Sequence, residues 1–109
     1  MSSNPIRPSE VKEHFEKNFP SFIIDAINDI IKESYRPNSK KFDVKLSIVK
    51  NKIITAISNY NDEFNASYQF QEYYLDFESL YNKFGWKVNF DKASYGDNYE
   101  SFYTFEVNE

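Results

Sequence analysis

The 109-residue sequence contains no cysteine, which excludes a disulfide-stapled scaffold, a thiolate zinc site and a cysteine nucleophile. Glycine is nearly missing as well, since only Gly85 and Gly96 occur, and the chain therefore has no glycine-rich phosphate-binding loop. No apolar run exceeds three residues, so no segment is apolar enough to span a membrane. We expect no signal peptide at the start of the chain. We therefore expect a soluble, cytosolic protein.

What the chain does contain is typical of one folded domain. Hydrophobic residues make up 40% of the sequence and charged residues 28%, close to the average of soluble globular proteins, which argues against disorder. A length of 109 residues also suits a single domain. We expect residues 1–8, which include two prolines, to form an N-terminal arm, and residues 9–109 to form one α+β domain.

Charge and aromatic residues are distributed unevenly along the chain. The net charge is −4, but residues 1–50 carry +2 and residues 51–109 carry −6. Residues 51–109 also hold 16 of the 21 aromatic residues. An acidic surface repels a phosphate backbone, whereas carboxylates beside tyrosine and phenylalanine suit a basic protein surface. The alternative is that these aromatic residues fill a small core.

Apolar residues at helical spacing predict four helices. These are Ser9–Phe19, residues 21–35, a helix that begins near Leu46, and residues 76–84. Asp76 is the expected N-cap of the fourth helix, and Gly85 is the expected left-handed residue after its end. Residues 59–65 are predicted to form a polar loop. Residues 66–74 fit both a strand and a helical turn, so both alternatives stay open there.

Alternating apolar and polar residues predict three strands. They cover residues 42–46, 86–90 and 103–107, and the last two form a hairpin with a long loop. Without the first helix, the element order is that of a winged helix in which the hairpin is the wing. We therefore expect an α+β, winged-helix-like domain. The expected core residues are Ile23, Ile27, Ile30, Ile31, Val49, Ile53, Leu80, Phe84, Trp86, Val88 and Phe105.

The C-terminal segment carries the most specific motif in the chain. It reads Gly-Trp-Lys-Val-Asn-Phe-Asp-Lys over residues 85–92, and is followed by Tyr95, Tyr99-Glu100 and residues 102–105, Phe-Tyr-Thr-Phe. This ending resembles that of a family of small, uncharacterised proteins of tailed bacteriophages and large DNA viruses. The family usually has tyrosine where this chain has Phe90, and proline where it has Ala93.

Two further segments are similar to the same family. Residues 22–31, which include Ala26-Ile27-Asn28, look like its first long helix, and Tyr74-Leu75-Asp76 with Tyr81 looks like its last helix. The resemblance implies a viral protein, located in the cytoplasm of an infected host cell or in the virion. It implies a fold but no activity.

The sequence offers no set of residues that combines a nucleophile, a base and an orienting group, so we expect the protein not to be an enzyme. His14 is the only histidine and has no cysteine or histidine partner. Paired carboxylates support acid–base chemistry only where burial separates their pKa values. The candidate pairs are Asp62–Glu63, Asp76–Glu78 and Asp97–Glu100. We expect neither a metal nor a cofactor.

The predicted hairpin loop is the leading candidate for a binding site. Exposed aromatic residues beside carboxylates are typical of contacts with a protein partner. The candidate residues are Asp91, Tyr95, Asp97, Tyr99, Glu100 and Tyr103. The alternative is that these tyrosines pack back onto the core. The leading hypothesis is thus a non-catalytic viral accessory protein that binds another viral or host protein.

A nucleic-acid-binding winged helix is the second hypothesis. The basic residues cluster in the middle of the chain, at Arg36, Lys40, Lys41, Lys45, Lys50 and Lys52. However, residues 76–84, in the recognition position, carry one cation and two anions and contain no arginine. Asn82 is the only residue there of a type that favours base reading. Binding to nucleic acid is therefore the less favoured alternative.

Overall fold

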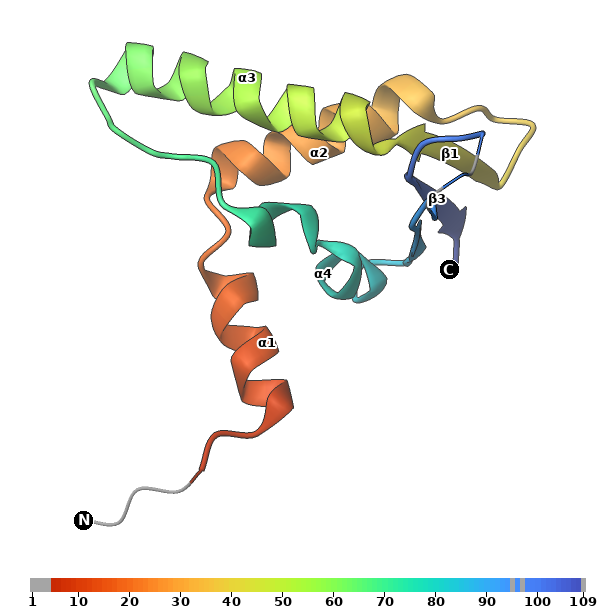
Figure 1. Ribbon diagram of the computed structural model, residues 1–109, viewed down its shortest axis with the longest axis horizontal. Helices are drawn as coiled ribbons and strands as arrows, with labels where there is room; N and C mark the ends of the chain where they lie inside the picture. Colours follow the sequence, from red (N-terminus) through yellow and green to blue (C-terminus); the bar gives the residue numbers. More distant parts are fainter. Residues whose placement is uncertain (1–4, 95, 97, 109) are drawn as a thin grey trace.

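A computed structural model of the protein describes residues 5–94, 96 and 98–108. In this part of the chain, four α-helices and one short 3₁₀ helix are interleaved with a three-stranded antiparallel sheet. Two long helices lie side by side, and the first helix projects away from them (Figure 1). The predicted α+β class is therefore confirmed. No helix in these residues is both long and apolar enough to cross a membrane.

The first two helices follow the predicted pattern. Helix α1 spans Pro8–Lys17, and helix α2 spans Ser21–Ser34, within one residue of the predicted end. Residues Ile23, Ile27 and Ile30 recur every three or four positions, so they form one buried stripe along α2. Helix α1 has no buried residue, and it projects from the body of the domain (Figure 1).

The third helix is longer than the sequence pattern indicates. Helix α3 spans Leu46–Phe64, so the loop predicted at residues 59–65 is wrong. Asn65 ends the helix with a positive φ of 51°. In the last turns, Tyr60 stacks on Phe22 of α2 with their ring centroids 4.2 Å apart. This contact with another helix stabilises turns whose own sequence is mostly polar.

The segment after α3 resolves the ambiguity at residues 66–74. Its first part has no regular structure, and Glu72–Leu75 forms the 3₁₀ helix η1. Helix α4 follows but covers only Glu78–Asn82, and Phe77 occupies its N-cap position. The predicted fourth helix is therefore present but shorter than the expected range 76–84, and the prediction of an Asp76 cap is wrong.

The burial of Phe77 is the physical reason why α4 begins later than predicted. A side chain that must enter the core determines how the chain approaches α4, and this outweighs the capping preference of the preceding aspartate. Gly85 does adopt the expected positive φ, at 89°, and turns the chain from α4 into the next strand.

The sheet contains the three predicted strands. They are β1 at Lys41–Lys45, β2 at Trp86–Asp91 and β3 at Phe102–Val107. Strand β3 lies in the centre and pairs antiparallel with both neighbours. Phe42, Phe105 and Val88 form one cross-strand row on the face that meets the helices. The hairpin predicted from the C-terminal pattern is confirmed.

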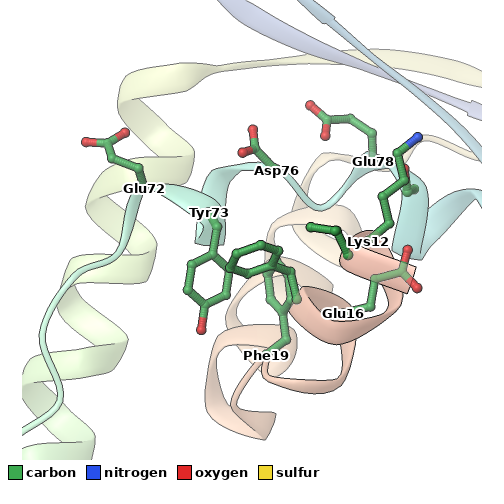
Figure 2. Close-up of a pocket in the computed structure, with 10 residues that line it drawn as sticks. Lys12, Glu16, Phe19, Glu72, Tyr73, Asp76 and Glu78 are labelled. Carbon is green, nitrogen blue, oxygen red and sulfur yellow. The ribbon is translucent and has the colours of Figure 1, made fainter. Parts of the chain in front are cut away.

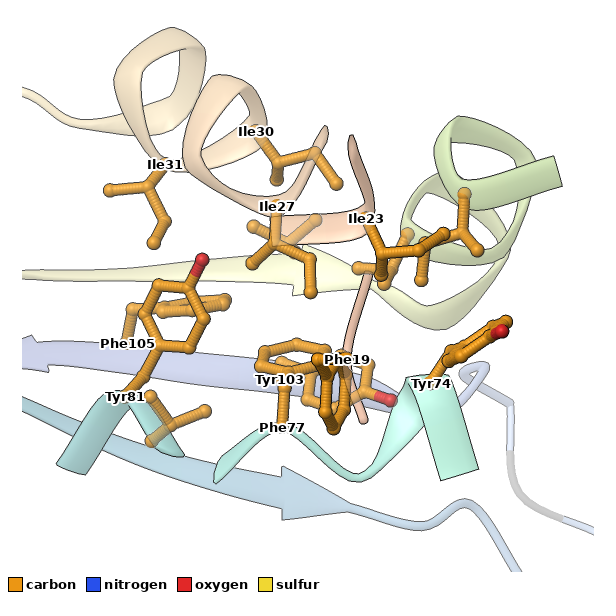
Figure 3. Close-up of a cluster of buried hydrophobic side chains, with 14 of the residues drawn as sticks. Phe19, Ile23, Ile27, Ile30, Ile31, Tyr74, Phe77, Tyr81, Tyr103 and Phe105 are labelled. Atoms are coloured by element: carbon orange, nitrogen blue, oxygen red, sulfur yellow. The ribbon is translucent and has the colours of Figure 1, made fainter. Parts of the chain in front are cut away.

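The core lies between α2, α3 and the inner face of the sheet (Figure 3). Most of the predicted core residues are buried: Ile23, Ile27, Ile30, Ile31, Val49, Ile53, Val88 and Phe105. Leu80 and Trp86 are only partly buried, and Phe84 is 70% exposed, so its assignment to the core is wrong. Besides Phe105, the core contains five aromatic residues that were not predicted there: Phe19, Tyr74, Phe77, Tyr81 and Tyr103.

Replacing Ile27 by alanine tests this core. Ile27 is fully buried, so Ile27→Ala is expected to lower the free energy of unfolding by about 2–5 kcal/mol. Ile54→Ala is the matched control, because Ile54 lies on α3 with its side chain exposed, and it is expected to change stability by less than about 1 kcal/mol. Urea denaturation measures both values. Equal effects of the two substitutions would contradict the assigned core.

Candidate protein-interaction surface

The outer face of the sheet is open to solvent and polar. Successive residues of a strand point to opposite faces, so Tyr103 and Phe105 point inward while their neighbours on β3 point outward. The outward residues form three rows across the sheet: Lys41, Glu106 and Lys87; Asp43, Thr104 and Asn89; Lys45, Phe102 and Asp91. The third row lies nearest to the hairpin loop.

A hollow of about 500 Å³ lies at this end of the outer face. It is lined by residues of β1, of the hairpin loop and of β3, among them Asp43, Tyr99, Glu100 and Phe102. The rings of Tyr99 and Phe102 meet edge to face with their centroids 5.9 Å apart. The Tyr99 hydroxyl donates a long hydrogen bond of 3.4 Å to the Asp91 carboxylate. An aromatic pair and carboxylates therefore share one exposed surface.

The hairpin loop is attached to the start of α3. The Ser47 hydroxyl donates to the Glu100 carboxylate at 3.2 Å, and the Lys45 ammonium group lies 4.0 Å from the same oxygen. The backbone amide of Leu46 also donates to the Ser101 carbonyl at 2.9 Å. Glu100 therefore positions the loop in addition to contributing charge to the surface.

The structure brings together part of the set of residues that the sequence predicted for an interaction site. Asp91, Tyr99 and Glu100 are exposed and gather at the hairpin end of the outer face, whereas Tyr95 and Asp97 lie outside the described residues. Tyr103 is only 1% exposed, so its placement on this surface is wrong. Phe102, which was not among the predicted residues, takes its place. The alternation along β3 could have identified Phe102. Tyr103 lies two residues before the core residue Phe105 and therefore faces the core, so its neighbour Phe102 faces outward.

Tyr103 joins the sheet to the segment that contains η1 and α4. Its ring stacks on Phe77 at 4.7 Å, and its hydroxyl donates to the Leu75 carbonyl at 2.7 Å. Burial raises the pKa of Tyr103 well above its usual range. Burial also raises the pKa of Tyr74 to about 12.

The raised pKa values of Tyr74 and Tyr103 predict that the folded protein becomes less stable at high pH. In the unfolded chain tyrosine ionises near pH 10, whereas the folded protein holds these protons to higher pH, so the free energy of unfolding falls as the pH rises above about 10. Tyr103→Phe is expected to cost about 1 kcal/mol at pH 7 through the lost hydrogen bond, and to make the fall between about pH 10 and 12 shallower. Denaturant unfolding at several pH values measures both. An unchanged slope would contradict the burial of the Tyr103 hydroxyl.

The predicted basic cluster is already engaged in several internal contacts. The Lys52 ammonium group lies 3.5 Å from the Glu33 carboxylate, and that of Lys50 lies over the Phe70 ring, 5.5 Å from its centroid. The Arg36 guanidinium donates to two main-chain carbonyls, each at 3.0 Å. Lys45 faces Glu100, as described above. The remaining two cations are Lys40, which lies just before β1, and Lys41, which is the first residue of β1. The structure does not assemble the six cations into one free basic face.

The element in the recognition position is also unsuited to base reading. The Asn82 side-chain oxygen accepts a hydrogen bond from the Val88 backbone amide at 2.9 Å. It therefore satisfies a main-chain donor on edge strand β2. The exposed carboxylates nearby, Glu72 and Asp76, would repel phosphate groups.

A second hollow, of about 510 Å³, separates α1 from η1 and α4 (Figure 2). Its apolar side includes Phe19 and Tyr73, and its other side carries Asp76 and Glu78. Burial is the largest cause of a raised pKa of Glu78, to which the charge of Asp76 also contributes. The Lys83 ammonium group, 2.6 Å from Glu16, ties α1 to the end of α4.

The other titratable candidates remain apart from this hollow. Asp62 and Glu63 are exposed near the C-terminal end of α3, and the side chain of His14 contacts the amide of Asn18 on the exposed side of α1. Within the described residues, no three histidine, cysteine, aspartate or glutamate side chains are grouped so that they could hold a metal ion.

Comparisons with known proteins add no assignment. Neither the protein-family models, nor the curated proteins, nor the solved structures give a match to this chain. The viral resemblance of the C-terminal motif therefore stays a prediction.

Proposed function

We propose that this protein is a non-catalytic viral accessory protein that acts by binding another protein, either in the virion or in the cytoplasm of the infected host cell. The surface that we assign to this contact is the hairpin face, defined as Asp91, Tyr99, Glu100 and Phe102. The partner is expected to present a basic surface. The observation that carries the proposal is the contact between the exposed Tyr99 ring and the partly buried Phe102 ring, at a hollow that Glu100 also lines and with Asp91 bonded to Tyr99.

The chemistry of the hairpin face favours a protein partner. Tyrosine provides a large contact area with few rotatable bonds, and Tyr99 is already oriented by Asp91 and Phe102. Aromatic side chains are enriched in interface hot spots, and the surrounding carboxylates steer a cationic partner toward them. The contacts of Glu100 with Ser47 and Lys45 hold the loop in place, which reduces the entropy lost on binding.

The finer fold class that we propose is winged-helix-like, with α2, α3 and α4 as the three helices and β2–β3 as the wing. In support of this, β1 lies between α2 and α3 in the chain and pairs with the second strand of the hairpin. This arrangement leaves binding to nucleic acid as the second candidate function. We favour it less because Asn82 is engaged with Val88 and half of the basic cluster faces carboxylates or an aromatic ring.

Removal of one aromatic side chain tests the hairpin face. Tyr99 is 49% exposed, so Tyr99→Ala is expected to leave the melting temperature unchanged and to weaken partner binding by about 1–2 kcal/mol or more. Tyr68→Ala is the matched control, because Tyr68 is similarly exposed beside the C-terminal end of α3, and it is expected to leave affinity unchanged.

The partner itself is identified by capture from infected cells with the unmodified protein and mass spectrometry. Affinity for that partner is then measured with each variant. A Tyr99→Ala variant that binds as tightly as the unmodified protein would exclude the hairpin face as the binding site.

Charge reversal tests the steering role of the carboxylates. Asp91→Lys is expected mainly to slow association, by about threefold to tenfold at low salt, because the hairpin face then repels a basic partner. Asp62→Lys makes the same change in net charge near the far end of α3 and is expected to have a smaller effect. Asp91 is preferable to Glu100 for this purpose, since reversal of Glu100 also breaks the attachment of the loop. Stopped-flow measurements give the two rates.

Salt dependence separates the two candidate functions. Binding to nucleic acid through several phosphates loses affinity steeply with salt, at about 0.9 powers of ten per contacted phosphate for each tenfold increase in concentration. We expect no measurable affinity for duplex DNA at about 150 mM salt in a fluorescence-anisotropy titration. Tight binding that is abolished by Lys40→Glu with Lys41→Glu would instead support the winged-helix alternative.

A further inference from the structure

An apolar patch surrounds Trp86, where α2 faces α4 and the start of β2. We call it the Trp86 patch and define it by Ile24, Tyr35, Leu80, Phe84, Trp86 and Val107. It contains two adjoining hollows, of about 330 and 470 Å³, which share Trp86 as a wall. Within the described residues, Phe84 is the most exposed large hydrophobic side chain, at 70%. A contiguous exposed apolar surface of this kind is typical of a protein contact site.

The Trp86 patch also contains residues that the sequence predicts to be buried but that a single chain leaves partly or largely exposed. The helical spacing predicted Leu80 and Phe84 as core residues, and the strand alternation predicted Trp86 as one. The fold of a single chain buries Leu80 and Trp86 only partly and leaves Phe84 at the surface. A second apolar surface placed against the patch would complete the burial that the sequence pattern indicates.

We propose that the Trp86 patch is the interface of a symmetric homodimer, in which the occupant of each patch is a second copy of this chain. A two-fold interface uses the same surface of both copies, so it must be complementary to itself. The patch meets this requirement, because the protruding Phe84 ring lies beside a hollow lined by Ile24, Leu80 and Trp86. In the dimer, each Phe84 enters this hollow of the other copy.

The charges along α2 also match a two-fold arrangement. Asp25 and Lys32 are seven residues apart, two helical turns, and therefore lie on the same flank of α2. Lys32 lines the second hollow, and the exposed Asp25 follows the patch residue Ile24 directly in the chain. A two-fold axis perpendicular to α2 makes the two copies of the helix antiparallel. Asp25 of each copy then faces Lys32 of the other.

The test is the molar mass in solution as a function of concentration. The patch is defined by six side chains, whereas a standard interface has about 20–30 residues on each side, so we expect a weak and reversible dimer. Sedimentation equilibrium from about 5 to about 500 µM brackets the affinities of such contacts. The weight-average mass is expected to rise from 13.0 kDa toward twice that value.

Two glutamate variants locate the contact. Phe84→Glu is expected to weaken self-association by about tenfold or more while the melting temperature stays unchanged, because this side chain is already exposed in one chain. Phe64→Glu is the matched control: Phe64 is 59% exposed at the end of α3, in the aromatic cluster with Tyr60, and its replacement is expected to leave the dimer intact.

Charge exchange along α2 tests the two-fold geometry. Asp25→Lys and Lys32→Asp are each expected to weaken the dimer. Each substitution places like charges opposite one another, and the two-fold symmetry repeats this repulsion at a second contact. The double variant restores the pairing with reversed signs and is expected to recover most of the affinity. A merely structural role of either residue would not produce this recovery.

Three results would overturn the proposal. The first is a mass of 13.0 kDa at every concentration, which would leave the patch to a different protein. The second is a dimer that is disrupted by Phe64→Glu and not by Phe84→Glu. The third is a double charge variant that is weaker than both single variants. Because the Trp86 patch and the hairpin face share no residue, failure of the dimer leaves the proposed function untouched.

Discussion

The contact between Tyr103 and the η1–α4 segment is the interaction on which the rest of the domain depends. Tyr103 lies on the central strand, its ring stacks on Phe77, and its hydroxyl bonds to the Leu75 carbonyl. A two-stranded hairpin is only marginally stable alone, and a five-residue helix such as α4 is not stable without tertiary support. Each of these elements is held in place by the other through Tyr103.

The direction of this one side chain also determines both surfaces for which we propose a role. Since Tyr103 points into the core, its neighbour Phe102 must point outward, and the hairpin face forms around it. On the other side, Phe77 enters the core and fixes α4 against the sheet. Gly85 then turns the chain sharply into β2, so that Phe84 and Trp86 flank this turn and form the Trp86 patch.

The acidic half of the sequence does not become one acidic face. The fold sends Asp91 and Glu100 to the hairpin face, and Asp76 and Glu78 to the hollow beside α1. The cations are divided in a similar way, because Lys45, Lys52 and Lys83 each face a carboxylate. The long-range electrostatic attraction of a basic partner is therefore weaker than the net charge of −6 over residues 51–109 suggests. Local pairs of aromatic and acidic residues matter more for recognition.

The sequence by itself determined the elements whose signal is local. The isoleucine stripe of α2, the alternation in β2 and β3, and the positive φ of Gly85 depend only on residues close in the chain, so periodicity and conformational preference identified them. Tertiary structure decided the length of α3 through the Tyr60–Phe22 stack, and the start of α4 through the burial of Phe77.

Tertiary structure also decided which aromatic residues are buried. Tyr103 and Phe84 both stand in apolar patterns, yet one is enclosed by the η1–α4 segment while the other projects from the domain. Hydrophobicity alone favours the burial of phenylalanine more than that of tyrosine, which is the opposite of what the structure shows. Alternation along β3 places Tyr103 on the inner face of the sheet, but whether a side chain is then covered depends on segments distant in the chain.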